Sequence, residues 1–554
     1  MGSWQDLVAD KKLRQQAAIP LDWVLKSPPA PDVLDVRTFP DSPQCGVLSE
    51  REITITNAVD VELLLAKLAS GEWSSVEVTT AYYKRAIIAH QLVNCLTEIF
   101  VDRALQRARE LDEHLKTTGK VVGPLHGLPI SLKDQIPIKG LECTMGYASW
   151  IGRYFEKDAV MTQVLYACGA VPFVMTNVPQ TLMWSETYNL VFGRTSNPAN
   201  RTLTCGGSSG GEGALGGMKG TPLGIGSDIG GSVRYPSAFN GLYGLRPSYH
   251  RIPYSGCVNS LMGQDSAPSV LGPISGSLSG VRAFMKAVIG QQPWLLDPLV
   301  VRKRWIEEEY QLADHGFGKQ LCFALMEDDG IVLPHPPLQR AMKMTADALR
   351  AAGHKGALRS CFAAIWLAGA LEDIDAVTAA SGEPRIESMA MPGAQAVDTG
   401  MGYPAGISAY ENWQLHKQRT ALREEYLALW QASAAETGTG RPVDAIILPV
   451  APSAAPPHGK SIIATYTVLG NIMNYPACVF PVTTVDPVQD PVQKRETFMS
   501  PTDEENYNLY HPDTFKNAPV SLQLMGQTLE EEAVLAMTEI VDNALKSKFG
   551  VVKK

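Results

Sequence analysis

Two serines stand in glycine-rich contexts that suit nucleophilic acyl transfer. Ser232 ends the segment IGGS at 229–232, and Ser208 lies in the segment GGSSGG at 206–211. Acyl transfer needs an activated hydroxyl, a base within hydrogen-bond reach, and backbone N–H groups aimed at the developing oxyanion. The backbone of 229–232 supplies successive N–H donors before the hydroxyl of Ser232, and Ser208 or Ser209 can relay a proton. The two segments therefore predict a serine nucleophile with an oxyanion hole.

Lys133 is the candidate base for this nucleophile. A short apolar strand is predicted over 128–132, and Lys133 follows it, so its side chain is expected to enter the interior. A lysine is plausible as a base only when its amine is uncharged, and burial away from water lowers the pKa of a lysine. A helix is predicted over 233–240, directly after Ser232, and the dipole at its N-terminus also favours negative charge there.

Two other interpretations of the glycine-rich block compete with a nucleophile. The segment 211–216 formally matches GxGxxG, which binds dinucleotides when it closes a strand and opens a helix. The preceding residues, 197–204, are turn formers rather than a hydrophobic strand, and the next acid, Asp228, follows too soon. A purely structural loop is the second alternative, since glycines allow positive φ and close backbone approach. Ile229 and Val233, which bracket Ser232, favour a defined structure over a flexible linker.

Composition limits the class of protein and its partners. The chain has 554 residues, a net charge of -9 and nine cysteines without a CxxC pair. No basic face is implied, so no nucleic-acid partner is expected, and unpaired cysteines suit a reducing compartment. The histidines show no zinc-binding spacing, so no metal and no cofactor are predicted. The first residues lack the apolar core of a signal peptide, and the apolar run at 361–371 is too short to span a membrane. A cytoplasmic location and no membrane contact are therefore expected.

Apolar strands alternate with helical patterns along the chain, which is typical of an α/β sheet. Asp158 is expected to cap the N-terminus of one of these helices. The expected strands span 128–132, 171–176, 444–450 and 519–525, and the expected helices span 101–115, 158–168, 233–240 and 529–546.

Three motifs together resemble the amidase signature family. They are GLPISLKD at 127–134, GGSSGG at 206–211 and DIGGSVR at 228–234, and they occur in the family's order and at its separations. Weaker matches extend the resemblance over most of 60–545. Within the family, the segments 124–135 and 241–247 look most like the fungal acetamidases, or general amidases.

The resemblance implies a Ser–Ser–Lys triad. Ser232 would be the nucleophile that becomes the acyl-enzyme, and Lys133 would be the terminal base. Ser208 would bridge them and contact substrate, with a cis peptide bond to Gly207. The backbone N–H groups of the nucleophile turn would form the oxyanion hole, namely those of Ile229, Gly230, Gly231 and Ser232.

Other residues are assigned supporting or neutral roles. By the resemblance, the backbone carbonyl of Leu182 would face the substrate, and Trp184 is a candidate for the pocket wall. Asp228 and Arg234 are expected to brace the nucleophile turn as a structural pair, and Ser209 is expected to support it. Aromatic residues and a buried thiol without a histidine partner are more often core than catalytic, so structural roles are expected for His126, Tyr188, Tyr466 and Cys205.

The resemblance implies an α/β fold in which a large mixed, twisted β-sheet carries helices on both faces. We expect an N-terminal arm with a helix at 1–58 and a single domain at 59–548. A mainly helical insertion at about 281–440 would shape the pocket.

The implied activity is hydrolysis of small carboxylic amides such as acetamide, giving a carboxylate and ammonia. Hydrolysis of carbamates, or of larger fatty or aryl amides, is the alternative on the same scaffold. Fatty acid amide hydrolases and the A subunit of the tRNA-dependent amidotransferase share the motifs. The membrane-bound hydrolases carry an apolar anchor that this sequence does not show, and the A subunit lacks the long arm and insertion. The expected partners are a small amide and water, and a homodimer is one option for the assembly.

Overall fold

The computed structural model describes residues 3–358, 380–382, 408–461 and 465–550. Its centre is an eleven-stranded sheet that mixes parallel and antiparallel neighbours. In spatial order its strands are β1 (Leu96–Ile99), β3 (Val171–Thr176), β2 (Pro129–Lys133), β8 (Leu223–Asp228), β10 (Val270–Ser275), β9 (Tyr243–Arg246), β14 (Ala477–Thr484), β15 (Pro519–Met525), β13 (Ala445–Pro449), β11 (Cys322–Leu325) and β12 (Lys355–Leu358).

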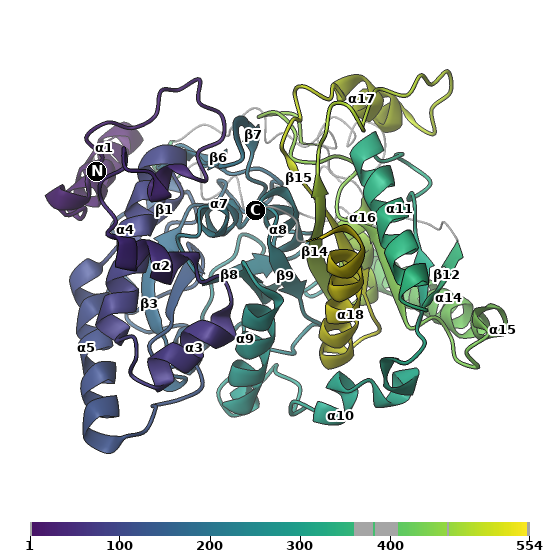
Figure 1. The fold of residues 1–554 in the computed structure, drawn as a ribbon, viewed down its shortest axis with the longest axis horizontal. Coiled ribbons are helices and arrows are strands. Elements are labelled where there is room, and N and C mark those ends of the chain that lie inside the picture. Colours follow the sequence, from purple (N-terminus) through teal and green to yellow (C-terminus); the bar gives the residue numbers. More distant parts are fainter. Residues whose placement is uncertain (1–2, 359–379, 383–407, 462–464, 551–554) are drawn as a thin grey trace.

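Helices cover both faces of this sheet, as the resemblance implied (Figure 1). They are α1 (Trp4–Ala17), α2 (Glu50–Asn57), α3 (Val61–Ala69), α4 (Ser75–Val93), α5 (Val101–Thr118), α6 (Val160–Ala167), α7 (Gly210–Gly217), α8 (Arg234–Phe239), α9 (Leu278–Gly290), α10 (Glu307–Tyr310), α11 (Pro336–Ala351), α14 (Ala409–Ala432), α15 (Ala434–Thr437), α16 (Thr465–Met473), α17 (Pro501–Leu509) and α18 (Glu531–Phe549).

Local sequence explains where these elements begin and end. The side chain of Asp60 accepts a hydrogen bond from the N–H of Glu62 and caps the start of α3. Helix α5 buries Ala104, Ala108 and Leu111 on one face and ends at Gly119, which has a left-handed φ of 66°. Strand β3 is buried along its whole length, as expected for an apolar strand with a sheet neighbour on each side and helices above and below.

Strand β2 lies inside the sheet, parallel to both of its neighbours, β3 and β8. In this register Lys133 is opposite Thr176, and Ser131 is opposite Gly224. Parallel neighbours bring the C-terminal ends of β2, β3 and β8 to the same edge of the sheet. That edge holds Lys133 and the start of the turn that leads to Ser232.

Two local segments differ from the expected pattern. Helix α6 starts at Val160 with Ala159 at the cap position, and Asp158 instead accepts a hydrogen bond from the N–H of Lys139, 2.7 Å away. The segment 197–204 was interpreted as turn formers rather than a hydrophobic strand, and with Ser196 it forms a small hairpin of two mainly polar strands, β6 (Ser196–Asn197) and β7 (Asn200–Thr204). This hairpin stays outside the central sheet, so α7 does not follow a sheet strand in the way a dinucleotide-binding loop requires.

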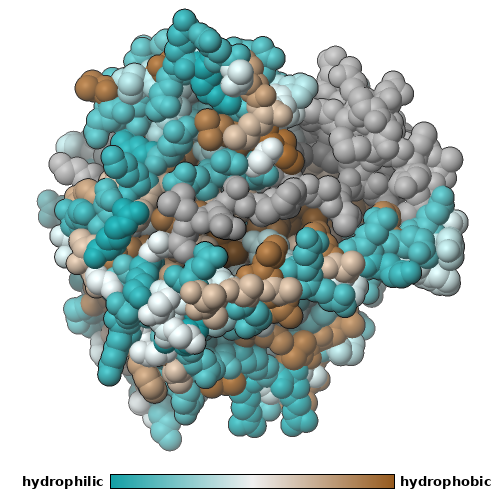
Figure 2. All heavy atoms as spheres, turned by 90° about the vertical axis from the view of Figure 1, so that its right-hand side faces the viewer, coloured by the Kyte–Doolittle hydropathy of each residue, from teal (hydrophilic) through white to brown (hydrophobic). Residues whose placement is uncertain are grey.

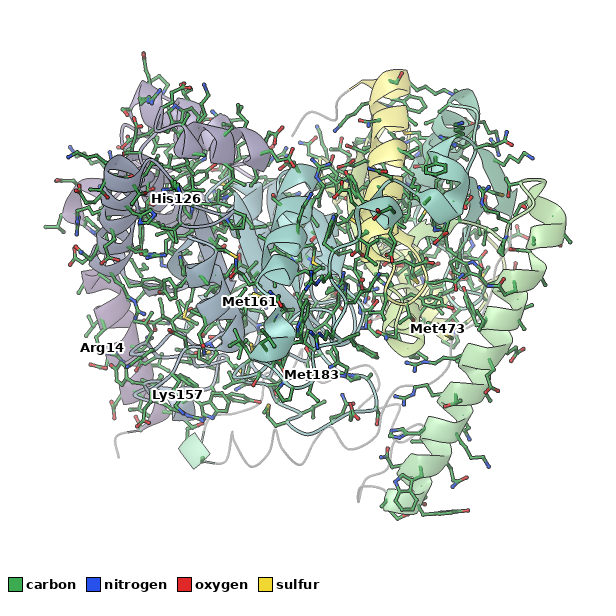
Figure 3. All side chains as sticks on the ribbon, turned by 90° about the horizontal axis from the view of Figure 1, so that it is seen from below. Arg14, His126, Lys157, Met161, Met183 and Met473 are labelled. Atoms are coloured by element: carbon green, nitrogen blue, oxygen red, sulfur yellow. The ribbon has the colours of Figure 1, made fainter. Side chains whose placement is uncertain are left out.

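The region 281–440 adds strands as well as helices, because β11 and β12 extend the central sheet on its β13 side. Part of this region lies outside the described residues, as does the apolar run at 361–371. Figure 3 shows α14 as the long helix that extends beyond the body of the protein. The division into an arm, one domain and a pocket-shaping insertion stays a prediction.

The surface offers no membrane-crossing element within the described residues, since none of their helices is both long and apolar enough. On the face drawn in Figure 2, hydrophilic residues are interspersed with hydrophobic ones.

Candidate functional site

Lys133 lies at the end of β2 with its side chain completely buried. Its Nζ atom is 2.7 Å from Ser208 Oγ and 2.7 Å from Ser227 Oγ. No carboxylate of the described chain lies within ion-pair distance of this amine. The lysine predicted from its position after an apolar strand thus contacts Ser208 directly.

Burial lowers the pKa of Lys133 from its ordinary value to about 7, and a negative charge on Asp228 or on Glu212 opposes this shift. An amine with this pKa is uncharged in a substantial fraction of molecules at neutral pH. A free amine has a lone pair that can accept a proton, which an ammonium group lacks.

The hydrogen bonds around Lys133 show which way its lone pair can point. Ser227 Oγ donates to Gln135 Oε1 over 2.6 Å, so Ser227 must accept from Lys133. Gln135 is held in turn, since its amide nitrogen donates to Tyr254 over 2.6 Å. The amine therefore uses one N–H for Ser227, and its lone pair is available to the hydroxyl of Ser208.

The loop that carries Ser208 is tightly enclosed. The peptide bond between Gly207 and Ser208 is cis. A Cβ atom at Gly207 would lie 2.2 Å from the carbonyl oxygen of Glu186 and 2.6 Å from that of Trp184, so only glycine fits there. The N–H of Ser209 donates to the carbonyl oxygen of Ser232 over 3.2 Å, which places the Ser208 loop beside the second candidate serine.

Ser232 lies in the turn between β8 and α8, with 9% of its surface exposed. Its hydroxyl has no hydrogen-bond partner among the residues that the structure describes. Gly231 adopts a φ of +129°, a backbone conformation that residues with a side chain rarely adopt. The hydroxyl is thus held at a sharp turn.

Three of the four N–H groups predicted for the oxyanion hole are unengaged. Within the described chain, the N–H groups of Ile229, Gly230 and Ser232 donate to no acceptor. The N–H of Gly231 instead donates to Asp228 Oδ1 over 2.8 Å. The turn therefore leaves three N–H groups without an acceptor in the described chain, and Gly231 helps to hold the turn in shape.

Asp228 and Arg234 form the expected brace, and both side chains are completely buried. Arg234 donates from Nε to Asp228 Oδ2 over 3.0 Å and from Nη2 to Asp228 Oδ1 over 2.9 Å. Burial alone would raise the pKa of Asp228, but the charges of Arg234 and Arg246 and the hydrogen bonds from Arg234 and Asn471 together outweigh burial, and the pKa falls well below its ordinary value. The carboxylate stays ionised and also accepts the N–H of Val233 over 3.2 Å.

Helix α16 completes this brace from a distant part of the chain. Arg234 donates to the carbonyl oxygen of Thr467 over 2.7 Å and to Asn471 Oδ1 over 2.6 Å. Thr467 Oγ1 donates to the carbonyl oxygen of Gly230 over 2.6 Å. The nucleophile turn is therefore fixed from both sides, by its own Asp228 and by α16.

Replacing Asp228 with alanine should destabilise the protein by about 3–5 kcal/mol, because Arg234 would keep a buried charge without its partner. Urea unfolding measures the effect. Asp10→Ala is the matched control, since Asp10 pairs with Arg14 over 2.8 Å on the surface, where such a pair contributes at most about 1 kcal/mol. Equal midpoints for the two variants would contradict the bracing role of Asp228.

Leu182 and Trp184 lie next to the Ser208 loop. Leu182 is buried and has a left-handed φ of 64°. Trp184 is also buried, its carbonyl oxygen approaches Gly207, and Arg194 stacks on its ring 5.8 Å from the centroid. Met183, which lies between these two residues in the chain, is labelled in Figure 3. Contact of either residue with a substrate stays a prediction.

The remaining residues considered from the sequence have partners or burial that suit structural roles. His126 is buried, and its Nδ1 accepts from the N–H of Val122 over 3.1 Å. Tyr466 donates to the carbonyl oxygen of Val332 over 2.6 Å, and Arg194 stacks on Tyr188. Burial raises the pKa of the Cys205 thiol to about 12, so it is not a ready nucleophile. The hydroxyl of Ser209 donates to the carbonyl oxygen of Ser227 over 3.3 Å and accepts from the N–H of Ser227 over 3.2 Å.

Sequence reasoning missed several residues that contact the site. Ser227 directly precedes the motif at 228–234 and Gln135 directly follows the motif at 127–134, so their positions beside the motifs were a signal for both. Thr467 and Asn471 had no such signal, because they are more than 230 residues away from the turn that they hold. Glu212 belongs to the glycine-rich block, but nothing in the sequence pattern indicated that its carboxyl would be buried against Ser131 and Thr176 of the sheet.

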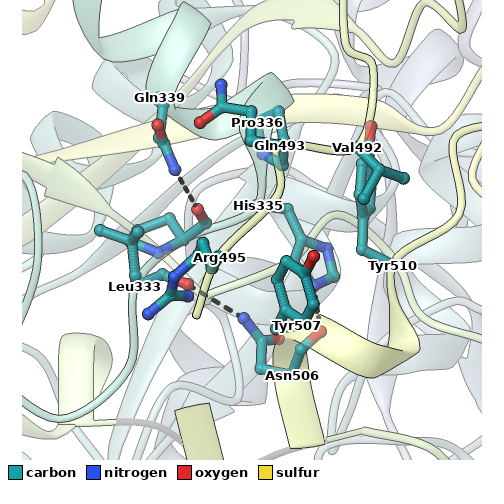
Figure 4. Close-up of a pocket in the computed structure, with 11 residues that line it drawn as sticks. Leu333, His335, Pro336, Gln339, Val492, Gln493, Arg495, Asn506, Tyr507 and Tyr510 are labelled. Carbon is teal, nitrogen blue, oxygen red and sulfur yellow. Dashed lines mark hydrogen bonds between the residues drawn. The ribbon is translucent and has the colours of Figure 1, made fainter. Parts of the chain in front are cut away.

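A separate pocket lies between the start of α11 and α17 (Figure 4), and none of the candidate catalytic residues lines it. His335 stands in its wall, donates from Nε2 to the carbonyl oxygen of Asn506 over 2.7 Å and packs against the ring of Tyr510. Burial lowers the pKa of His335 to about 4. Across the described ranges no group of acidic, histidine or cysteine side chains is arranged to hold a metal ion.

Comparison with known proteins places this geometry in a family. The sequence model of the Amidase family matches residues 77–535. An acetamidase from Emericella nidulans is 42% identical over 98% of both chains, and one from Aspergillus oryzae is 42% identical over 98% of this chain and 99% of the relative. A solved fatty acid amide hydrolase has a TM-score of 0.87 at 32% identity, covering 98% of this chain and 95% of that chain. The chain therefore belongs to the amidase signature family and is a hydrolase of amide C–N bonds.

Proposed function

We propose that this amidase hydrolyses small carboxylic amides such as acetamide through a Ser232–Ser208–Lys133 triad and an acyl-enzyme. The observation that supports this most is the 2.7 Å contact between a buried, readily uncharged Lys133 and Ser208. A buried lysine with a purely structural role would stay charged by pairing with a carboxylate. The amine of Lys133 has no carboxylate within ion-pair distance in the described chain.

Each proton in the proposed reaction has a donor and an acceptor. Lys133 takes the proton of Ser208 while Ser208 takes the proton of Ser232, whose oxygen attacks the amide carbonyl. The tetrahedral intermediate collapses as the proton returns through Ser208 to the leaving nitrogen, so ammonia departs and the acyl group stays on Ser232. Water then attacks the acyl-enzyme by the same relay, and the carboxylate leaves.

The proposed oxyanion hole uses the N–H groups of Ile229, Gly230 and Ser232. They are preorganised donors because the Asp228–Arg234 pair and Thr467 hold the turn before any substrate arrives. The carbonyl of Leu182 and the side chain of Trp184 are proposed to contact the substrate from the neighbouring segment. The cytoplasmic location and the homodimer remain predictions from the sequence.

The choice of small amides rests on the acetamidases, which match this chain along its length. A second candidate is hydrolysis of larger amides, favoured by the similarity to a protein named fatty acid amide hydrolase. Carbamates such as ethyl carbamate present the same carbonyl to the nucleophile and form a third substrate class.

A panel of acetamide, butyramide, benzamide, an acyl anilide and ethyl carbamate tests the substrate class. We expect kcat/KM for acetamide or butyramide to exceed that for each of the others at least about tenfold, since a pocket shaped for a small acyl group discriminates by this much. Ammonia release measures the unsubstituted amides and the carbamate, and aniline release measures the anilide. The highest kcat/KM on the anilide or the carbamate would contradict the proposal on substrate size.

A further inference from the structure

Glu212 is a completely buried acid that the proposed reaction does not use. It belongs to the first turn of α7, and its carboxyl reaches the strands at the site of Lys133. Gly224 of β8 makes room for it, because a Cβ atom there would lie 1.9 Å from Glu212 Oε2. The chain therefore contains a fitted space for this carboxyl group.

The carboxyl ends a chain of hydroxyl groups. Glu212 Oε1 is 2.8 Å from Thr176 Oγ1, and Glu212 Oε2 contacts Ser131 Oγ. Ser131 Oγ is 3.1 Å from Thr221 Oγ1, which is 2.8 Å from the carbonyl oxygen of Leu223. Within the described chain, no backbone N–H donates to this carboxyl.

Counting hydrogen atoms along this chain favours a neutral Glu212. The four contacts need four hydrogens, but the hydroxyls of Thr176, Ser131 and Thr221 supply only three. Thr176 must donate to Glu212, and Thr221 must donate to the carbonyl of Leu223, which can only accept. Ser131 then donates to Thr221, so the contact between Ser131 and Glu212 has no hydrogen unless the carboxyl provides it.

We propose that Glu212 is a protonated carboxylic acid in the resting enzyme, which donates to Ser131 and thereby keeps a negative charge away from Lys133. Glu212 is then a positioning residue for the triad, and this role rests on the proposed function. An anion held here would favour the charged form of Lys133, which cannot accept the proton of Ser208.

The two groups are neighbours through the sheet. Ser131 and Lys133 are two positions apart on β2 and so share one face, and Thr176 is the register partner of Lys133 on β3. Burial raises the pKa of Glu212 to about 8, which agrees with the hydrogen count.

Other ionisable groups around α7 do not supply a counter-charge. The Cys95 thiol faces Glu212, and burial holds its pKa well above the ordinary value, so it stays neutral. Arg85 of α4 pairs with Asp41, and Arg234 of α8 pairs with Asp228. Lys133 is therefore the group whose charge responds to that of Glu212.

Infrared spectroscopy tests the protonation state without using activity. The difference spectrum between wild type and Glu212→Gln at pH 7 should contain the C=O stretch of a protonated carboxylic acid, lost in the variant. Loss of carboxylate bands instead would overturn the proposal. Because this measurement needs only folded protein, it determines the protonation state of Glu212 even if none of the amides proves to be a substrate.

The pH dependence of kcat/KM tests the link to Lys133. Glu212→Gln should leave the acidic limb of the profile, where activity falls as the pH is lowered, at its wild-type position, because an amide also donates to Ser131 and accepts from Thr176. Thr221→Val removes one acceptor of the chain at nearly constant volume, so Ser131 can donate to Glu212 and the carboxyl ionises more easily. The acidic limb should then move up by about half a pH unit or more.

The double variant Thr221→Val/Glu212→Gln separates charge from packing. It should return the acidic limb to the wild-type position, because no carboxyl remains to ionise. A shift that persists in the double variant would overturn the proposal, as would a downward shift in Glu212→Gln alone. Failure of the triad itself would appear differently, as retained activity in variants of Ser232 or Lys133.

Discussion

Replacing Ser232 with alanine should lower kcat for acetamide by about 10⁴-fold or more, with the fold intact. The variant loses the only atom proposed to bond to the acyl group, and the remaining donors can at best assist a slow attack by water. Ser232 has no hydrogen-bonded hydroxyl partner in the described chain, so its removal leaves no buried group unsatisfied. Ammonia release measures the loss, and the urea-unfolding midpoint checks the fold.

Ser70→Ala is the matched control, because Ser70 is an exposed serine at the end of α3 and should keep full activity. A fluorophosphonate should add its mass to the peptide that contains Ser232 in the wild type and not in Ser232→Ala. Normal turnover in Ser232→Ala, or labelling confined to another peptide, would remove Ser232 from the role of nucleophile.

Replacing Lys133 with alanine should lower kcat/KM by about 10³-fold at neutral pH, because general acid–base catalysis contributes about 10²–10⁴-fold. Lys133→Arg should not restore activity, since a guanidinium group stays protonated and has no lone pair to offer Ser208. Lys116→Ala is the control, because Lys116 is 80% exposed on α5. Near-normal turnover in Lys133→Ala would show that another group is the base.

The same residue should govern the acidic side of the pH profile. Burial places the pKa of Lys133 at about 7, and only the free amine can accept a proton. As the pH falls through this value the amine becomes charged, so kcat/KM in the wild type should fall about tenfold per pH unit below it. A profile flat down to pH 5 would contradict an uncharged Lys133 as the working form.

The sequence predicted the parts of this protein that depend on neighbouring residues. Strands β3 and β15 have the predicted limits, because each is a run of apolar residues that sheet neighbours and helices cover. Lys133 was assigned to the interior because it ends an apolar strand, and the structure buries it completely. The three motifs also identified the family, which the comparisons confirm.

Local residue patterns did not predict the hydrogen-bond partners of two segments. Asp158 has the type of a helix cap, but Lys139 offers its N–H from another segment, and the carboxylate binds there. The turn-forming segment 197–204 became a hairpin because its two short halves can pair with each other. The position of Asp158 does not follow from local propensity, since the N–H that it binds lies 19 residues away in the chain.

The sequence by itself therefore determined the family, the candidate triad and the apolar strands, because these depend on residue types at short spacing. Only the tertiary structure decided which atoms surround the triad. In the folded chain, Thr467 and Asn471 of α16 contact the nucleophile turn and its Asp228. The N–H of Gly231 donates to Asp228, and Glu212 is buried beside the strand that carries Lys133. The physical reason is that burial and hydrogen bonding set the charge of Lys133, and both arise when segments far apart in the chain pack together.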